Sequence, residues 1–299
     1  MKLAFLISAH KDPEHLKKLI ESLPEGSEFF IHIDLKSDIT AFTRLIQGKN
    51  IHFLPNRVNV IWGSINEVVY QMALVEAALT SDADYLITLS GMDYPVWSNA
   101  RILEFFEENQ GRNILQGISM VHQGAVAQLY RELRFLADKP WKTGSLLSKF
   151  RVGLRKSISF LGINKTLQIH APEKVYDLYK GAAWWAITRE LAQFVLQQWK
   201  GNERLVKYFR TSFCPAETFV QTVAFNSKYA DSCMLSKGAY MSLAALTPLT
   251  YINYDPVIKI LDETDYDKII GSGKMFCRKV ITGDSERLMK LIDQEREAK

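Results

Sequence analysis

The sequence predicts an α/β fold in which a mostly parallel sheet carries helices on both faces. Two observations support this prediction. Short apolar runs of strand length recur through the first third of the chain, and between them lie segments whose apolar residues return every three or four positions. Strands and helices that alternate in this way typically form parallel sheets that are covered on both faces.

The first strand and the first helix have clear boundaries. Residues 2–9 form an apolar run flanked by polar residues, which is typical of a strand buried on both faces. Asp12 can cap the following helix, and Pro13 suits its first position. The apolar stripe of this helix consists of Leu16, Leu19, Ile20 and Leu23. The Pro-Glu-Gly run at 24–26 ends it.

The alternation continues through the next elements. Residues 29–34 and 51–54 are expected to be strands, with a short helix over 39–46 between them. Ser64 and Glu67 have the spacing of a capping box that opens a helix reaching Leu79. Residues 85–89 form another apolar run, and Ser98 can cap a helix with the stripe Ile102, Phe105 and Phe106.

The second half of the chain is less regular. We expect a helix after Thr188, a second that starts at Pro215, and a terminal helix near Leu288. Their apolar stripes are Leu191, Phe194, Val195 and Trp199, then Phe219, Val220 and Val223, then Leu288, Leu291 and Ile292. No linker separates these elements, so residues 1–299 are interpreted as one domain.

Composition excludes several classes of protein. Of the 299 residues 47% are hydrophobic and 23% are charged, which excludes a disordered chain. A net charge of +4 is too small to indicate a nucleic-acid partner. The three cysteines are widely spaced, which argues against a disulfide framework and against a structural zinc site. Because the first apolar run is also too short for a signal or spanning segment, we expect a cytoplasmic protein.

Residues 139–165 form a basic segment without any acidic residue. Its basic residues are Lys139, Lys142, Lys149, Arg151, Arg155, Lys156 and Lys165. Apolar residues are interleaved with them, so the segment could lie on the anionic inner face of the cell membrane. The alternative interpretation is a solvated insertion loop.

Polar residues follow several of the expected strands. They include His10, Asp34 and Asp93, and open α/β sheets bind ligands beyond the carboxyl ends of their strands. The chain has no dinucleotide fingerprint, P-loop, zinc-protease motif or serine-hydrolase motif. Motif spacing alone therefore indicates a ligand site without naming its chemistry.

An ordered set of short segments carries a resemblance to a known family. These segments are FLISAHK at 5–11, IHIDLKS at 31–37, VIWGS at 60–64, LSGMDYP at 89–95, YKGAAWW at 179–185, CPAETFVQT at 214–222 and SGKMFCRK at 272–279. Together they resemble the core-2/I-branching family of β-1,6-N-acetylglucosaminyltransferases, which also contains the peptide O-xylosyltransferases. The matches run in order over nearly the whole chain.

The resemblance implies a glycosyltransferase fold of the GT-A type and an inverting transfer from a UDP-sugar. Residues 1–115 would then bind the nucleotide sugar, and residues 116–299 would supply the acceptor and catalytic half. UDP-GlcNAc is the leading donor and UDP-xylose the second. The acceptor would be a hydroxyl of a saccharide or of a lipid-linked saccharide. No metal cofactor is implied, because basic side chains neutralise the diphosphate in this family.

The resemblance also assigns roles to individual residues. Glu217 matches the catalytic base, and its place in a first helical turn would favour the ionised form. Lys279 matches the lysine that contacts the diphosphate. Thr250 stands where the family has a second diphosphate contact, an arginine, so Arg278 or Lys274 is expected to supply that charge.

The remaining candidates have weaker assignments. Asp34, His10 and Asp93 are expected to bind the donor, although each could simply stabilise a strand end. Trp184 and Trp185 are expected to bind the acceptor, although either or both could be core residues.

Two other functions stay open at this point. One is a metal-dependent GT-A enzyme that uses Asp93, and the other is a protein that binds UDP or a sugar without catalysis.

Overall fold

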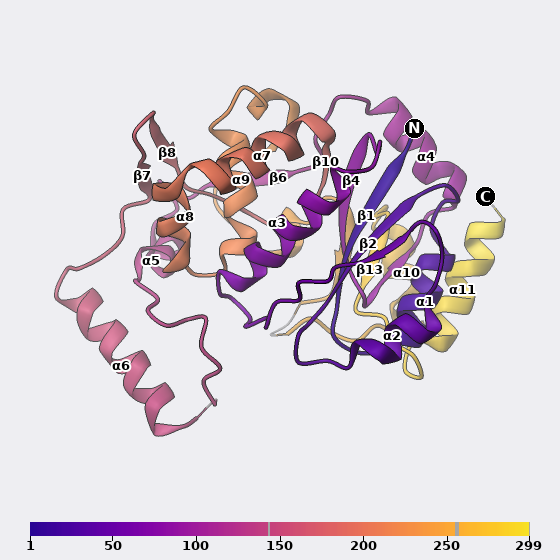
Figure 1. The fold of residues 1–299 in the computed structure, drawn as a ribbon, viewed down its shortest axis with the longest axis horizontal. Helices are drawn as coiled ribbons and strands as arrows, with labels where there is room; N and C mark the ends of the chain where they lie inside the picture. Colours follow the sequence, from indigo (N-terminus) through magenta and orange to yellow (C-terminus); the bar gives the residue numbers. More distant parts are fainter. Residues whose placement is uncertain (143, 255–256, 299) are drawn as a thin grey trace.

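The computed structural model describes residues 1–142, 144–254 and 257–298. Its central sheet contains β1 (Leu3–Ala9), β2 (Glu28–Ile33), β3 (Ile51–Phe53), β4 (Tyr85–Ser90) and β10 (Ala186–Thr188). The strand order is β10-β4-β1-β2-β3, and only the edge strand β10 runs antiparallel to its neighbour (Figure 1). The predicted mostly parallel sheet is confirmed.

Helices cover both faces of this sheet, as the sequence predicts. On one face α3 (Asn66–Ala78) and α7 (Arg189–Gly201) pack against side chains such as Leu6 and Leu86. On the other face α1 (Pro13–Glu21), α2 (Ile39–Leu45) and α4 (Asn99–Glu108) pack against neighbours such as Phe5 and Ile87. Successive strand residues point to opposite faces, so one buried strand contributes side chains to the hydrophobic cores on both faces of the sheet.

The start of α3 differs from the prediction. The helix begins at Asn66 after Ile65, and no side chain caps it. The Ser64 hydroxyl instead donates to the Ile61 carbonyl and accepts from the Asn66 backbone N–H at 3.3 Å, while the Glu67 carboxylate accepts from the Gly63 backbone N–H at 2.8 Å. The predicted capping box is therefore wrong, because the preceding turn uses both side chains. The predicted caps Asp12 and Ser98 are confirmed.

Smaller sheets surround the carboxyl ends of the central strands. One contains β11 (Met234–Leu235), β6 (Gln116–Ser119) and β9 (Tyr179–Gly181). Gly181 lets β9 lie close to β6, because a Cβ there would sit 2.1 Å from the Gln116 carbonyl oxygen. A hairpin of β7 (Gln168–His170) and β8 (Val175–Asp177) lies outside this sheet.

The second half contains α7 and α11 (Glu286–Glu297) near two of the predicted positions, together with helices that the sequence analysis did not predict. The remaining helices of this half are α5 (Ala125–Arg131), α6 (Leu146–Phe160), α8 (Glu203–Arg210), α9 (Phe219–Phe225) and α10 (Tyr266–Gly271), with 3-10 turns at η1 (Pro215–Glu217), η2 (Ala230–Ser232), η3 (Ala244–Leu246) and η4 (Glu263–Asp265). The helix expected to begin at Pro215 begins at Phe219. Pro215 starts a separate 3-10 turn, so Glu217 does not lie in the first turn of an α-helix.

The C-terminal strands return to the first half of the chain. Strand β13 (Phe276–Arg278) pairs in parallel with β12 (Thr250–Ile252) and antiparallel with β5 (Asp93–Pro95). This register sets Arg278 opposite Asp93. Residues nearly two hundred positions apart therefore meet at one end of the central sheet.

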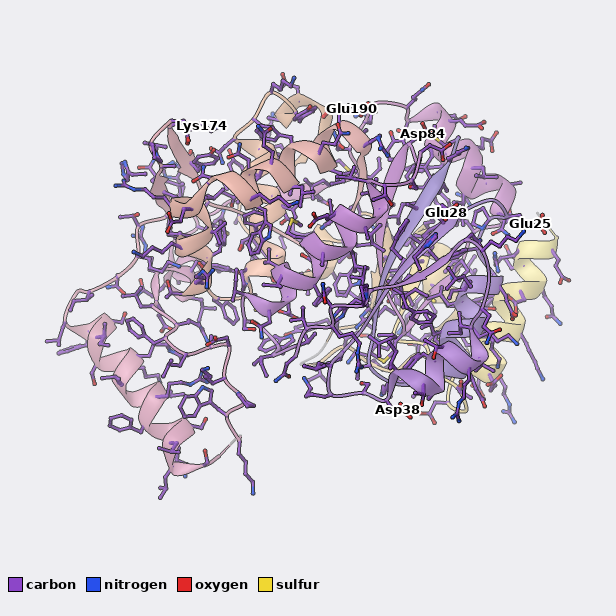
Figure 2. The ribbon with its side chains drawn as sticks, viewed as in Figure 1. Glu25, Glu28, Asp38, Asp84, Lys174 and Glu190 are labelled. Atoms are coloured by element: carbon purple, nitrogen blue, oxygen red, sulfur yellow. The ribbon has the colours of Figure 1, made fainter. Side chains whose placement is uncertain are left out.

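Helix α6 stands away from this body (Figure 1), and none of its described residues is buried. Charged side chains such as Glu25, Asp38 and Glu190 project from the outside of the molecule, whereas α6 also exposes aromatic rings (Figure 2). Among the described residues, none of the helices combines the length and apolarity needed to cross a bilayer.

Candidate active site

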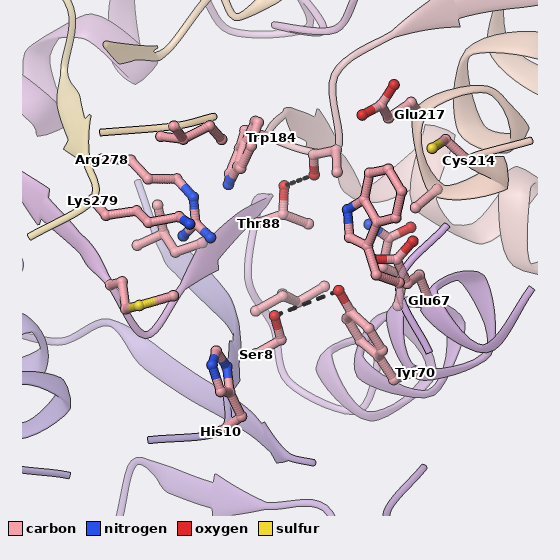
Figure 3. Close-up of a pocket in the computed structure, with 18 of the residues that line it drawn as sticks. Ser8, His10, Glu67, Tyr70, Thr88, Trp184, Cys214, Glu217, Arg278 and Lys279 are labelled. Carbon is pink, nitrogen blue, oxygen red and sulfur yellow. Dashed lines mark hydrogen bonds between the residues drawn. The ribbon is translucent and has the colours of Figure 1, made fainter. Parts of the chain in front are cut away.

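A cavity of about 540 Å³ opens at the carboxyl ends of β1 and β4. Both halves of the chain line it: Ser8 lies near the end of β1 and His10 follows it, while Glu217 and Lys279 come from the second half. Glu217 lies on the side of the cavity opposite Arg278 and Lys279 (Figure 3). The predicted ligand site at the strand ends thus coincides with a real cavity.

Glu217 occupies the end of the η1 turn, and its side chain is 22% exposed. The turn follows Cys214, whose φ of 42° lies in the left-handed region. One carboxylate oxygen of Glu217 lies 2.5 Å from the Lys180 ammonium. This ion pair with Lys180 stands in place of the helix terminus that the sequence predicts beside Glu217.

Lys180 itself is a buried cation that sequence reasoning missed. Its side chain is 5% exposed and lies near the Tyr130 and Tyr240 rings. Burial opposes its charge, but the Glu217 carboxylate and these tyrosines raise the pKa of Lys180 above its ordinary value. Its partner is 37 positions away, so no local pattern could have identified the pair.

Arg278 and Lys279 are two cations on the wall of the cavity opposite Glu217. The Arg278 guanidinium donates to an Asp93 oxygen at 2.9 Å and lies 5.1 Å from the Trp184 ring centroid. Burial, together with the Arg278 and Lys11 charges, lowers the pKa of Lys279. Among the described residues Lys279 has no acidic partner within ion-pair distance, which leaves its ammonium available to an anionic ligand.

Asp93 does not line the cavity, and its side chain is fully buried. It accepts from Arg278 and from the Ser90 backbone N–H at 2.8 Å. Both oxygens are engaged behind Arg278 and the side chain has no exposed surface, so Asp93 does not reach a donor in the cavity. The alternative of a metal site at Asp93 stays a prediction. Within residues 1–142, 144–254 and 257–298, no group of three or more His, Cys, Asp and Glu side chains is placed to hold a metal.

The other predicted diphosphate contacts also separate in space. Arg278 reaches the cavity, whereas the Lys274 ammonium donates to the Thr247 and Pro248 carbonyls and lies outside it. Of the two residues expected to replace the arginine missing at Thr250, only Arg278 is in position.

His10 lies in the cavity as expected, together with Lys11, which sequence reasoning missed. Asp34 lies at the end of β2 and does not line the cavity. Its carboxylate accepts from the Lys36 ammonium at 2.9 Å and from the Val60 backbone N–H at 3.4 Å. Although burial acts in the opposite direction, these contacts lower the pKa of Asp34. A uridine contact through Asp34 stays a prediction.

The two tryptophans have different environments. Trp184 lines the cavity beside Arg278. Trp185 is fully buried and packs in the core on the α3 side of the sheet. The expectation that Trp185 binds the acceptor is wrong, because its indole has no exposed surface.

Helix α3 supplies a wall that the sequence analysis overlooked. Glu67, Tyr70, Gln71 and Leu74 all line the cavity, and we call these four residues the α3 wall. Their spacing of three and four positions places them on one face of the helix. Polar residues on an otherwise buried helix face were the available signal, but Glu67 had been assigned to the capping box.

Comparison with known proteins agrees with the sequence resemblance. The family described as "Core-2/I-Branching enzyme" matches residues 3–255 of this chain. The chain belongs to the Core-2/I-Branching enzyme family. This membership, with the mostly parallel sheet, confirms the predicted GT-A-type fold class.

Several curated members of the family are similar to the chain. Xylosyltransferase sqv-6 of Caenorhabditis briggsae is 23% identical over 79% of this chain and 28% of its own length. Xylosyltransferase oxt of Drosophila melanogaster is 26% identical over 78% of this chain and 25% of its own length. The human N-acetyllactosaminide beta-1,6-N-acetylglucosaminyl-transferase is 23% identical over 74% of this chain and 52% of its own length. The chain thus spans about a quarter of these xylosyltransferases and about half of the human enzyme.

Proposed function

We propose that this protein is an inverting, metal-independent glycosyltransferase that moves a sugar from a UDP-sugar to a saccharide hydroxyl. The observation that carries the proposal is that the Glu217 carboxylate and two cations lie opposite each other across a single cavity. Glu217 lies on one wall, and Arg278 and Lys279 lie on the other. An inverting transfer needs a base and a leaving-group stabiliser on opposite faces of the reacting sugar.

The proposed reaction takes place in one displacement. The acceptor hydroxyl gives its proton to the Glu217 carboxylate while its oxygen forms a bond to the anomeric carbon. The bond from that carbon to the diphosphate oxygen breaks, and its electron pair leaves with UDP. Arg278 and Lys279 stabilise the negative charge that develops on the diphosphate. Asp93 holds the Arg278 guanidinium at the cavity edge.

UDP-GlcNAc is the first proposed donor and UDP-xylose the second. Support comes from the names of the relatives, which are xylosyltransferases and an N-acetylglucosaminyl-transferase. We expect one of these donors to raise the thermal unfolding temperature and to be turned over in the presence of EDTA. Activity that EDTA abolishes and Mn²⁺ restores would contradict the metal-independent mechanism. Binding of UDP without any turnover would instead indicate a non-catalytic binding protein.

We also propose that the protein acts in the cytoplasm at the inner face of the membrane, on a lipid-linked saccharide. Helix α6 supports this proposal, because Leu146, Phe150 and Phe160 are 84%, 69% and 92% exposed. Helical spacing places Lys149 and Lys156 along one edge of this apolar stripe. Such a helix can insert its apolar face while its lysines contact anionic headgroups. The free cysteines suit a reducing compartment.

A flotation experiment tests the membrane contact. The exposed lysines Lys142, Lys149 and Lys156 are changed together to glutamine, while Arg155, which pairs with Glu132, is left intact. At about 1 kcal/mol per basic residue, partitioning onto phosphatidylglycerol vesicles should fall about 100-fold. The matched control changes Lys228, Lys268 and Lys290, which are exposed and lie outside residues 139–165. The proposed membrane contact would be refuted if both triple variants floated equally with the vesicles. It would also be refuted if the wild-type protein did not float.

A further inference from the structure

The α3 wall contains two polar side chains that the proposed displacement does not use. Glu67 and Gln71 lie one helical turn apart on the same face of α3, and both line the cavity. Neither residue takes the proton or contacts the leaving group in the proposed mechanism. Their chemistry therefore requires a separate explanation.

Gln71 is buried, yet its side-chain oxygen has no hydrogen-bond donor among the described residues. Buried polar atoms in folded proteins nearly always have a partner, because an unpaired buried acceptor is costly. Since Gln71 lines the cavity, a molecule in that cavity can supply the missing donor.

Glu67 adds a second oxygen acceptor beside the first. The Gly63 backbone N–H is the one hydrogen-bond donor to its carboxylate within the described part of the chain. Burial raises the pKa of Glu67 to about 7, with the Glu217 charge acting in the same direction. Both the ionised and the protonated carboxyl present an acceptor oxygen, so the wall offers acceptors at neutral pH.

The position of the α3 wall in the cavity indicates which part of a bound substrate would contact it. Glu67 lies on the same side of the cavity as Cys214 and Glu217, facing Arg278 and Lys279 (Figure 3). The reacting sugars must lie between those two sides. Hydroxyl groups and acetamido N–H groups of a sugar ring are the donors that such a pair of acceptors would bind.

We propose that Glu67 and Gln71 form a subsite that accepts hydrogen bonds from the hydroxyl or amide N–H groups of a sugar ring. The subsite rests on the proposed function for its ligand class. The ring is either the transferred sugar of the donor or a sugar of the acceptor, and these two sources share the same chemistry.

Equilibrium binding to two single variants tests the subsite. Glu67→Met and Gln71→Met each remove the acceptor oxygen and leave a side chain of similar volume. The probes are UDP, UDP-GlcNAc, UDP-xylose and methyl glycosides of galactose and N-acetylglucosamine, measured by calorimetry. We expect sugar-bearing ligands to bind about 10-fold more weakly, because one lost hydrogen bond to a buried partner commonly has an effect of this size. UDP, which has no transferred sugar, should bind unchanged.

The pattern of losses identifies the sugar. Weaker binding of the UDP-sugars with normal UDP binding places the transferred sugar on the α3 wall, whereas weaker binding of the methyl glycosides alone places the acceptor there. Glu76→Met, at an exposed position on the same helix, is the matched control. Unchanged affinity for all probes in variants that fold normally, or an equal loss for UDP itself, would overturn the subsite. Because no turnover is measured, this result is separate from whether Glu217 is a base.

Discussion

Replacing Glu217 with glutamine should reduce sugar transfer about 10²–10⁴-fold while leaving UDP affinity unchanged. An amide cannot take the acceptor proton, and a positioned base typically contributes a factor of this size. Arg278 and Lys279, the cations proposed to bind UDP, lie on the opposite wall, so they keep their positions. Single-turnover transfer from the preferred UDP-sugar measures the loss, and calorimetry with UDP measures the retained binding.

Two control variants make this result specific. Glu217→Gln also leaves the buried Lys180 ammonium without its carboxylate, which could lower stability by about 3 kcal/mol. The double variant Glu217→Gln, Lys180→Met removes both charges and should recover that stability but remain inactive. Glu190→Gln, an exposed glutamate on α7, should keep full activity. Transfer at the wild-type rate by Glu217→Gln would refute the proposed base.

Lys279→Met should reduce the rate of transfer by about 100-fold with little change in the unfolding temperature. Removing one preorganised group that stabilises developing negative charge commonly costs this much. Lys279 takes part in no ion pair within the described residues, so the folded protein loses no internal partner. Transfer kinetics and thermal unfolding, measured on the same preparation, test both parts of this expectation.

Arg278→Met provides the comparison, because it removes a cation that does have an internal partner. It should slow transfer and also destabilise the fold by about 3 kcal/mol, since Asp93 is fully buried and loses its counter-charge. Lys268→Met, on the exposed face of α10, should alter neither property. If Lys279→Met transferred sugar as fast as Lys268→Met, Lys279 would not be a diphosphate contact.

Much of the fold followed from local patterns. The run at 2–9, the stripe from Leu16 to Leu23 and the cap at Asp12 each reflect the geometry of one element, and each prediction is confirmed. The capping box at Ser64 was misassigned because the preceding turn competes for the same side chains. That competition depends on a loop conformation that residue spacing does not specify.

The candidate site was only partly predictable. Ordered motifs pointed to Glu217, Arg278, Lys279 and Trp184, and the structure brings all four into one cavity. Trp185 and Asp93 belong to the same motifs but are buried. Adjacent residues in a motif can face opposite ways, so a motif does not determine which of its side chains reaches a ligand.

Local patterns were enough to predict a mostly parallel sheet, the helices on its two faces and the family to which the chain belongs. Those features depend on periodicities and short motifs that span a few neighbouring residues. The pairing of Lys180 with Glu217, the contact of Asp93 with Arg278, and the position of Glu67 and Gln71 on the cavity wall became visible only in the folded protein. The first two pairs join residues 37 and 185 positions apart. Burial and charge pairing over such separations depend on how distant elements pack, which no local pattern contains.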